Sequence, residues 1–332
     1  MLRLRSLMLL LAAVLALPLA AKTAKEDDAE KPYGALAFRS LGPLVGGRVT
    51  RVAGVAGSTI FYAATAQGGV WKSGNNGIDW EPIFDDEFSQ SIGAIAVAPS
   101  DANVLYVGGG EGNPRGNVAL GHGIWRSTDA GASWEHVLKL KGQIGTIAVH
   151  PANPDIAFAA VLGSPFGPGP QRGVYRTLDG GKHWSQVLKV DANTGASDVA
   201  IDPHNPRIVY AGMWAMRRTP WSAQSGGAGG GLFRSSDGGT SFEKVEHEAI
   251  PKGVVGKVGV AFAPSQPGRI YALIEAQGGG LFRSDDGGGD WKRINEHHVL
   301  TQRAWYYMTM TVDPSDADTV WFPQVPLLRS QD

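Results

Sequence analysis

The residues of this sequence that could do chemistry lie between short apolar segments, and they are mainly arginine, tryptophan, asparagine and glutamate. Such side chains suit recognition of a carbohydrate, or of an acidic or peptide ligand, because indole faces stack on sugar rings and guanidinium groups hold carboxylates. The same residue types also occur as solvated loop residues or as bridges between neighbouring structural units, and this alternative stays open. The predicted ligand-binding residues are Arg48, Asn113, Arg115, Asn117, Arg217, Arg218, Trp221, Arg303 and Trp305.

A catalytic role would need carboxylates in a particular arrangement. Hydrolysis of a glycosidic bond uses two carboxyl groups that face each other across that bond. The best candidates are Glu111 and Glu275, with Asp85 or Asp86 behind them. His122 and the pair 297–298 have no metal-ligating partners at a recognisable spacing, so we predict no metal site and no cofactor.

A second group of acidic residues belongs to a motif of eight residues, Ser/Thr-x-Asp-x-Gly-x-x-Trp, whose clearest copy is Ser127–Trp134. In a tight turn, the aspartate accepts hydrogen bonds from backbone N–H groups and the glycine takes positive φ. A carboxylate held in this way is not raised in pKa, so we predict that these residues are structural and not catalytic. The third motif position is occupied by Asn75, Asp129, Asp179, Asp237 and Asp286.

The spacing of the motif predicts the fold. Successive copies are 54, 50, 58 and 49 residues apart, which is the length of one four-stranded propeller blade. The flanks repeat too: an apolar segment that ends in proline, such as Ile147–Pro151, precedes two further strand-like segments, and the second of these runs into the motif. The sequence therefore predicts an all-β protein, a β-propeller of four-stranded antiparallel blades. In each blade the motif joins the third and fourth strands, on one common face.

The boundaries follow from the repeat. We expect a lead-in segment over residues 22–46 and the propeller over residues 47–332, with five complete blades and a partial sixth. The last three residues, 330–332, match the opening of a sixth motif. We therefore expect the sequence to be a fragment that is incomplete at its C-terminus. The repeat does not indicate an oligomeric state.

Residues 1–21 have the pattern of a secretory signal peptide. Arg3 and Arg5 precede an apolar run over 7–19, and Ala20 and Ala21 stand where a signal peptidase requires small residues. We favour a cleaved signal over an uncleaved anchor, and so expect a secreted or periplasmic protein with no membrane span after cleavage. The chain has no cysteine, its net charge is −1 and no basic run follows the signal, so we expect neither disulfides nor a nucleic-acid partner.

The repeated motif is the Asp-box, and the chain resembles the propellers with bacterial neuraminidase repeats that carry it. From about residue 36 onward the chain resembles a group of secreted bacterial repeat proteins of the sortilin or glycosyl-hydrolase type. This resemblance rests on the segments 41–48, 109–113 with 115–117, 217–221 and 302–307. It implies a longer chain built on tandem or large propellers. Sialidases, xyloglucanases, sortilin-type receptors and photosystem assembly factors share the Asp-box, so it specifies a fold and not a reaction.

Two known chemistries lack support in the sequence. Where a xyloglucanase has a catalytic Asp followed by x-Gly-Gly, this chain has Ala66–Gly69, and the sialidase pattern does not continue after Phe38-Arg39. The leading hypothesis is an exported scaffold that binds a glycan or peptide ligand. The alternative is a glycoside hydrolase whose carboxylates lie partly in the missing C-terminal part. We expect Glu111, Arg115, Arg217, Arg218 and Trp221 to converge in one cleft on the face opposite the motifs.

Overall fold

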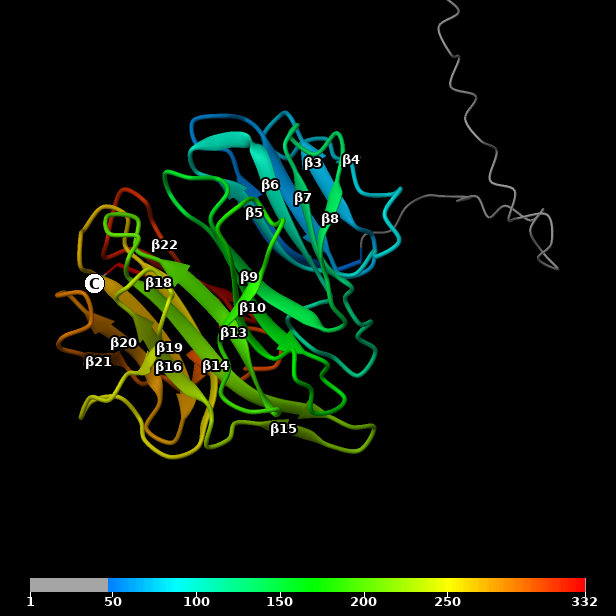
Figure 1. Cartoon of the computed structure of the whole chain (residues 1–332). Coiled ribbons are helices and arrows are strands. Elements are labelled where there is room, and N and C mark those ends of the chain that lie inside the picture. The colour runs from blue at the N-terminus through cyan, green and yellow to red at the C-terminus, as the bar shows by residue number, and fades with distance from the viewer. Residues whose placement is uncertain (1–46, 332) are drawn as a thin grey trace, which may run out of the picture. The chain divides into compact units, whose positions relative to one another are not determined.

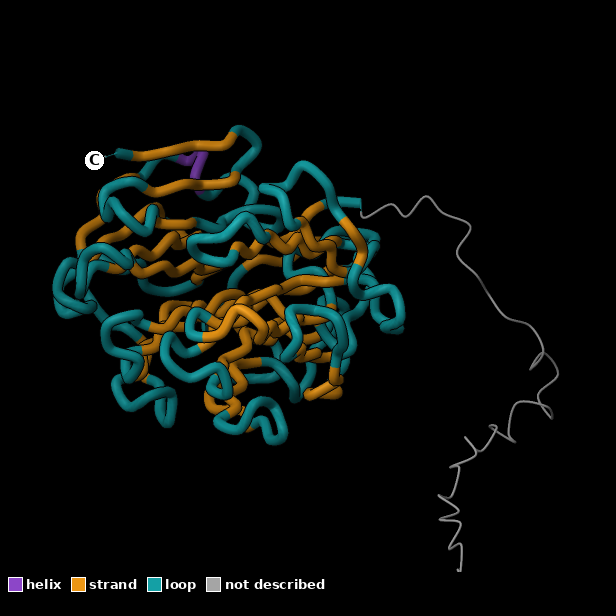
Figure 2. The backbone as a smooth tube through the Cα atoms, turned by 90° about the horizontal axis from the view of Figure 1, so that it is seen from above, coloured by secondary structure: helices purple, strands orange, loops and turns teal. Residues whose placement is uncertain are grey.

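The computed structural model describes residues 47–331, and the regular secondary structure of this part of the chain is almost entirely β-strand (Figure 1). The predicted signal peptide, the lead-in segment up to residue 46 and Asp332 lie outside the described residues. Within residues 47–331, the only helical element is a 3-10 turn, η1 (His298–Leu300). It lies against the last sheet, where Gln324 donates a hydrogen bond to the Leu300 carbonyl at 2.8 Å (Figure 2).

The strands form six antiparallel sheets, each of which follows chain order. We number these sheets as blades 1 to 6. Blade 1 contains β1 (Val49–Gly54), β2 (Phe61–Thr65), β3 (Val70–Ser73) and β4 (Glu81–Pro82); blade 2 contains β5 (Ile92–Ala98), β6 (Asp101–Gly109), β7 (Gly123–Ser127) and β8 (Glu135–Lys139); blade 3 contains β9 (Gln143–Val149), β10 (Ala157–Gly163), β11 (Gly173–Thr177) and β12 (Ser185–Leu188).

The remaining three blades continue the pattern, with one addition and one shorter sheet. Blade 4 contains β13 (Thr194–Ile201), β14 (Val209–Arg218), β16 (Gly231–Ser235) and β17 (Glu243–Lys244), with β15 (Ala223–Ser225) added to β14; blade 5 contains β18 (Val255–Phe262), β19 (Ile270–Ala276), β20 (Gly280–Ser284) and β21 (Lys292–Asn295); blade 6 contains β22 (Thr311–Val312), β23 (Val320–Pro323) and β24 (Leu327–Ser330). The prediction of five complete blades and a partial sixth is confirmed.

The blades are arranged as a propeller. One central hollow is lined by the first strand of blade 1 and by residues from the first strands of four further blades: Thr146, Asp198, Val260 and Thr311. The core is divided into five main clusters of buried apolar residues, and each cluster lies between two consecutive blades. Strand β10 is buried along its whole length because blades pack on both of its faces.

The motif loops join the third and fourth strands, as predicted. The motif carboxylates accept hydrogen bonds from groups of their own loops. Asp129 accepts hydrogen bonds from the Ser133 backbone N at 2.8 Å and from the Ser127 hydroxyl at 2.7 Å. Together with the Ser133 hydroxyl, which makes the largest contribution, these donors lower the pKa of Asp129 to about 2. The backbone N of Ala130 donates to the Asn103 carbonyl, which places the motif loop beside the start of β6.

A repeated contact joins four of the described blades to the next blade at this same edge. The second strand carries an aromatic residue that lies opposite a basic residue of the third strand; in blade 4 these are Tyr210 and Arg234. The Tyr210 hydroxyl donates to the Gly287 carbonyl of the next blade at 3.0 Å. A Cβ atom at Gly288 would lie 1.7 Å from that hydroxyl, so glycine is required there. Equivalent hydroxyl contacts are made by Tyr62, Tyr106 and Tyr271.

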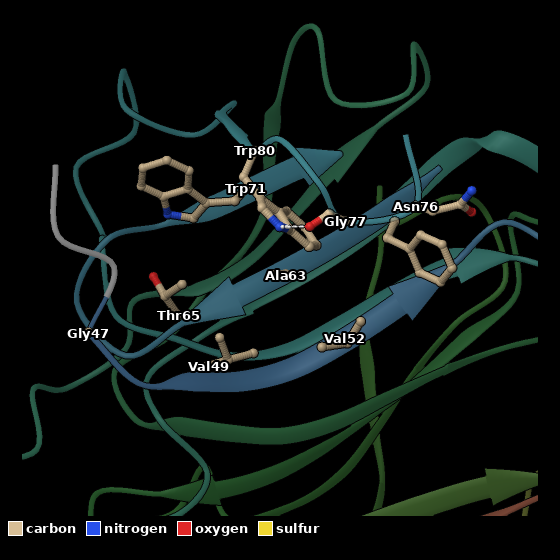
Figure 3. A pocket seen from close by; sticks show the side chains of 10 residues that line it. Gly47, Val49, Val52, Ala63, Thr65, Trp71, Asn76, Gly77 and Trp80 are labelled. Atoms are coloured by element: carbon tan, nitrogen blue, oxygen red, sulfur yellow. Dashed lines mark hydrogen bonds between the residues drawn. The ribbon is translucent and has the colours of Figure 1, made fainter. Parts of the chain in front are cut away.

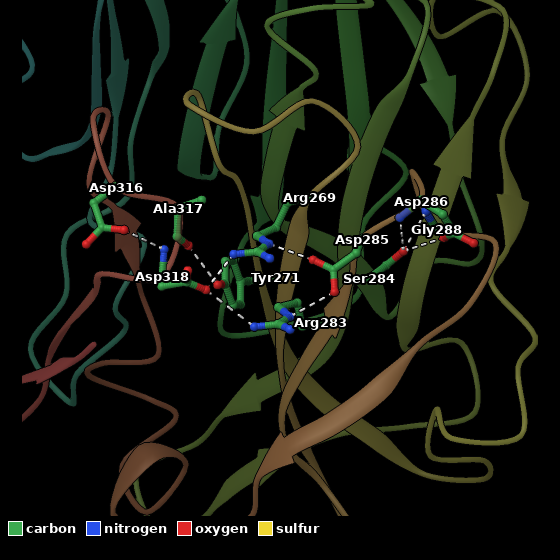
Figure 4. A network of polar contacts seen from close by, with 10 residues as sticks. All are labelled: Arg269, Tyr271, Arg283, Ser284, Asp285, Asp286, Gly288, Asp316, Ala317 and Asp318. Atoms are coloured by element: carbon green, nitrogen blue, oxygen red, sulfur yellow. Dashed lines mark hydrogen bonds and ion pairs between the residues drawn. The ribbon is translucent and has the colours of Figure 1, made fainter. Parts of the chain in front are cut away.

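Between blades 5 and 6 the contact widens into a charged network (Figure 4). Arg269 donates to Asp285 at 2.6 Å and to Asp318 at 2.5 Å, and Arg283 donates to Asp285 at 3.2 Å. The edge that carries the motif loops is therefore filled with contacts that hold the blades together. Its acidic and basic side chains are largely paired with one another.

Candidate functional site

The edge opposite the motif loops carries a polar cleft of about 310 Å³. It lies where the start of β1, the connection from β6 to β7 and the segment between η1 and β22 meet. We call it the arginine cleft; its lining residues are Arg48, Val49, Thr50, Glu111, Asn113, Arg115, Arg303, Tyr306 and Tyr307. A concave surface with a few aimed polar groups is the usual form of a ligand site.

Glu111 and Arg48 form an ion pair inside the cleft, in which Arg48 Nη2 donates to Glu111 Oε2. Glu111 follows β6 in a glycine-rich connection that presses on blade 3, and a Cβ atom at Gly112 would lie 2.7 Å from the Cα atom of Gly145. Glu111 is only 4% exposed, and this burial raises its pKa, while the guanidinium groups of Arg48 and Arg115 oppose the rise. The carboxyl group is therefore held in place by the fold and by Arg48.

Lys257 lies beneath the cleft and connects two of its walls. Its ammonium group donates to Asn113 Oδ1 at 2.9 Å and to the Tyr307 carbonyl at 2.7 Å, and lies 5.6 Å from the centre of the Trp214 ring. Burial, assisted by the positive charge of Arg51, lowers the pKa of Lys257 to about 7, although nearby carboxylates oppose the shift. The sequence prediction missed Lys257. A single lysine in the otherwise apolar segment 255–262 was the available signal.

Arg217 and Arg218, by contrast, lie on different sides of one strand. The guanidinium carbon of Arg218 lies 5.9 Å from the centre of the Trp305 ring, and Trp305 packs edge-on against Trp214. Arg217 lines a second polar hollow of about 320 Å³, together with Gln224. Successive side chains of a strand alternate between its faces, and both arginines belong to β14.

The structure therefore brings together only part of the predicted set. Arg48, Asn113, Arg115 and Arg303 meet Glu111 in the arginine cleft. Asn117, Arg217, Arg218, Trp221 and Trp305 do not line this cleft. Trp221 is 85% exposed in the turn between β14 and β15, and it lines neither polar hollow. The expected convergence of Arg217, Arg218 and Trp221 with Glu111 and Arg115 does not occur.

Glu275 is also separated from Glu111. Its Oε2 atom accepts hydrogen bonds from the Ser225 hydroxyl at 2.6 Å and from the Lys257 backbone N at 2.7 Å. It does not line the arginine cleft, so the two glutamates do not face each other across that cleft. Asp85 and Asp86 are exposed in the turn that precedes blade 2.

Other possible sites offer less chemistry. Residues 47–331 contain no group of three or more His, Cys, Asp or Glu side chains that could hold a metal ion. No helix in this part of the chain is long and apolar enough to cross a membrane. A hollow of about 460 Å³ on blade 1 is lined by apolar residues such as Val49, Val52 and Trp71 (Figure 3), and no acidic or basic side chain lines it. It has the character of a packing surface.

Comparison with known proteins supports the fold. No protein-family model matches the chain, and no curated protein matches it. Among solved structures, an ancestral GH74 enzyme aligns with a TM-score of 0.60 and 22% identity over 87% of this chain and 36% of that chain. The GH74 xyloglucanase from Xanthomonas campestris aligns with a TM-score of 0.55 and 21% identity, over 89% of this chain and 53% of that chain. The chain thus spans between about a third and about a half of these neighbours. At this identity, the likeness shows a shared β-propeller fold.

Proposed function

We propose that this protein is an exported binding scaffold that holds a glycan or peptide ligand in the arginine cleft. The observation that supports this most is the state of two guanidinium groups. Arg115 and Arg303 line the cleft, and within residues 47–331 the guanidinium group of neither residue donates a hydrogen bond or forms an ion pair. Arg115 interacts with Glu111 only through the longer-range attraction that lowers the pKa of that carboxyl group.

The opposite edge of the blades offers no comparable set of free groups. There the motif carboxylates accept hydrogen bonds from their own loops, and Arg269 and Arg283 are bound to Asp285 and Asp318. Ligands need donors that are exposed and not yet satisfied, so the arginine cleft is the better candidate. Export is the part of the proposal that rests on the sequence pattern of residues 1–21 alone.

A glycoside hydrolase is the second candidate, and one observation favours it. Burial raises the pKa of Glu111, as is required of a general acid in glycoside hydrolysis. The likeness to GH74 enzymes is consistent with this candidate through the fold. One observation argues against a hydrolase. Glu275 does not line the arginine cleft, so Glu111 and Glu275 do not form a catalytic pair there. A hydrolase would need its second carboxylate from elsewhere.

Glycan and peptide arrays probed with the wild type and with matched variants separate these candidates. We expect Arg115→Ala and Arg303→Ala to lose at least tenfold in affinity, because each removes an unsatisfied guanidinium group from the cleft. Arg217→Ala is the control. It removes a guanidinium group that lies outside the arginine cleft, so ligand binding by this variant should be unchanged. Equal binding by all three variants would contradict the proposal. Turnover of a bound glycan that Glu111→Gln abolishes would establish the hydrolase instead.

A further inference from the structure

The charges of the arginine cleft restrict the class of ligand. The charge of Arg48 is countered by Glu111, whereas Arg115 and Arg303 keep unused N–H donors. The guanidinium carbon of Arg303 lies 5.1 Å from the centre of the Tyr306 ring and 5.6 Å from that of Tyr307. These cation–π contacts hold the group without occupying its hydrogen-bonding edge. Two guanidinium groups in one cleft are suited to an anion.

Groups of a different kind lie in the same cleft. Glu111 uses Oε2 toward Arg48, which leaves Oε1 as an acceptor, and Asn113 uses Oδ1 toward Lys257, which leaves its amide nitrogen as a donor. Within the described part of the chain, the hydroxyl groups of Tyr306 and Tyr307 have no hydrogen-bond partner. The cleft therefore offers charged donors for an anion and, beside them, neutral donors and acceptors that suit hydroxyl groups.

The size and charge of the cleft favour one kind of anion. A volume of about 310 Å³ is at the lower end of the range for ligand pockets, enough for one or two sugar rings. Glu111 reduces the net positive charge of the cleft, which lessens the advantage that a dianionic phosphate would have over a monovalent carboxylate. A peptide terminus would also bring a side chain that needs its own pocket, and Val49 is the only aliphatic residue in the lining.

We infer, building on the proposed function, that the arginine cleft binds a glycan through the carboxylate of a uronic acid residue. Arg115 and Arg303 hold the carboxylate, and Glu111 and Asn113 hydrogen-bond to ring hydroxyls. The ion pair with Arg48 keeps Glu111 in position as an acceptor. Lys257 beneath the cleft adds to the attraction while it is protonated. No bond is made or broken in this interaction.

Calorimetric titration with matched probes tests this inference. The probes are trimers of galacturonate and of glucuronate, the corresponding neutral galactose and glucose trimers, and a short peptide with either a free or an amidated C-terminus. We expect one of the uronate trimers to bind and its neutral counterpart to bind at least tenfold more weakly. Raising the salt concentration should weaken binding, since the attraction is between charges.

Variants locate the interaction. Arg115→Gln and Arg303→Gln should each lower uronate affinity at least tenfold. Arg217→Gln is the control outside the cleft and should leave this affinity unchanged. Both target side chains lie at the surface, and unchanged thermal unfolding would confirm that the variants fold. Equal affinity for neutral and acidic trimers, lost in Tyr306→Ala, would overturn the uronate inference while the proposed function stands. Binding of the free-carboxylate peptide alone would also overturn it, and no binding of any array or titration ligand would overturn both.

Discussion

At the scale of single residues, the cleft depends on a buried cation outside its lining. Lys257 is 3% exposed, and its ammonium group joins Asn113 of blade 2 to Tyr307 of the segment before blade 6. Placing a charge in the interior is unfavourable unless hydrogen bonds and neighbouring charges compensate for it. The nearby Glu275 and Asp198 give partial compensation, and the pKa of Lys257 remains lowered, at about 7.

This lowered pKa predicts how stability changes with pH. Between pH 7 and pH 10 the unfolded chain keeps its lysine protonated, whereas Lys257 in the folded protein loses its proton, so the unfolded state binds more protons. The free energy of unfolding should therefore rise with pH in this window, by up to about 1.4 kcal/mol per pH unit, relative to a variant without the group. Urea unfolding of the wild type and of Lys257→Met at pH 7, 8 and 9 measures the difference. Parallel pH dependences would show that Lys257 does not titrate there.

The sequence could predict some of these residues and not others. The loops that carry Glu111, Arg115 and Arg303 were identified because each lies on the side opposite the motifs in any propeller of this period. Which of these loops meet could not be predicted, because Arg48 and Arg303 are 255 positions apart and lie in one cleft only through the way the blades pack. Lys257 is visible as one lysine in the apolar segment 255–262, but the strand pattern does not show that its ammonium group reaches Asn113 of another blade.

At the scale of elements, strand β14 explains why the predicted cleft is divided. Strand β14 continues to Arg218, into the segment that carries three of the predicted ligand-binding residues, and pairs with β15, where Arg217 lies opposite Gln224. Successive side chains of a strand point to opposite faces of the sheet, so Arg217 and Arg218 point in opposite directions. The sequence signal was weak, since Pro220 and the glycines of 226–231 are typical of loops.

The repeated aromatic residue of the second strand predicts a measurable contribution to stability. Tyr210 is fully buried, and its hydroxyl donates to the Gly287 carbonyl of the next blade. Tyr210→Phe removes this hydrogen bond and leaves the carbonyl without that donor, so we expect a loss of about 1 kcal/mol. Blade 3 has Phe158 at the same position, which shows that the ring alone can be accommodated.

The midpoint of urea unfolding measures this loss. Tyr306→Phe is the control, because its hydroxyl has no hydrogen-bond partner within residues 47–331 and its removal should leave the midpoint unchanged. An unchanged midpoint for Tyr210→Phe would mean that the hydroxyl contact adds no stability between blades 4 and 5.

At the scale of the whole molecule, the two edges of the blades differ: one carries contacts between neighbouring blades and the other carries the arginine cleft. The motif edge joins neighbouring blades through tyrosine hydroxyls and through ion pairs such as Arg269 with Asp318. The opposite edge has longer connections and holds the arginine cleft. A period of about fifty residues was enough to predict this division, because each repeat is one supersecondary unit with fixed strand order.

Hydrogen–deuterium exchange with and without the strongest array ligand tests the ligand-binding role of the arginine cleft most directly. Bound ligand shields backbone amides and slows local opening, so exchange should slow in residues 110–118 and 302–308, which border the arginine cleft. The motif loops 127–134, 235–242 and 284–291 should exchange at unchanged rates. The account would be contradicted if the ligand slowed exchange in the motif loops and left exchange in residues 110–118 and 302–308 unchanged.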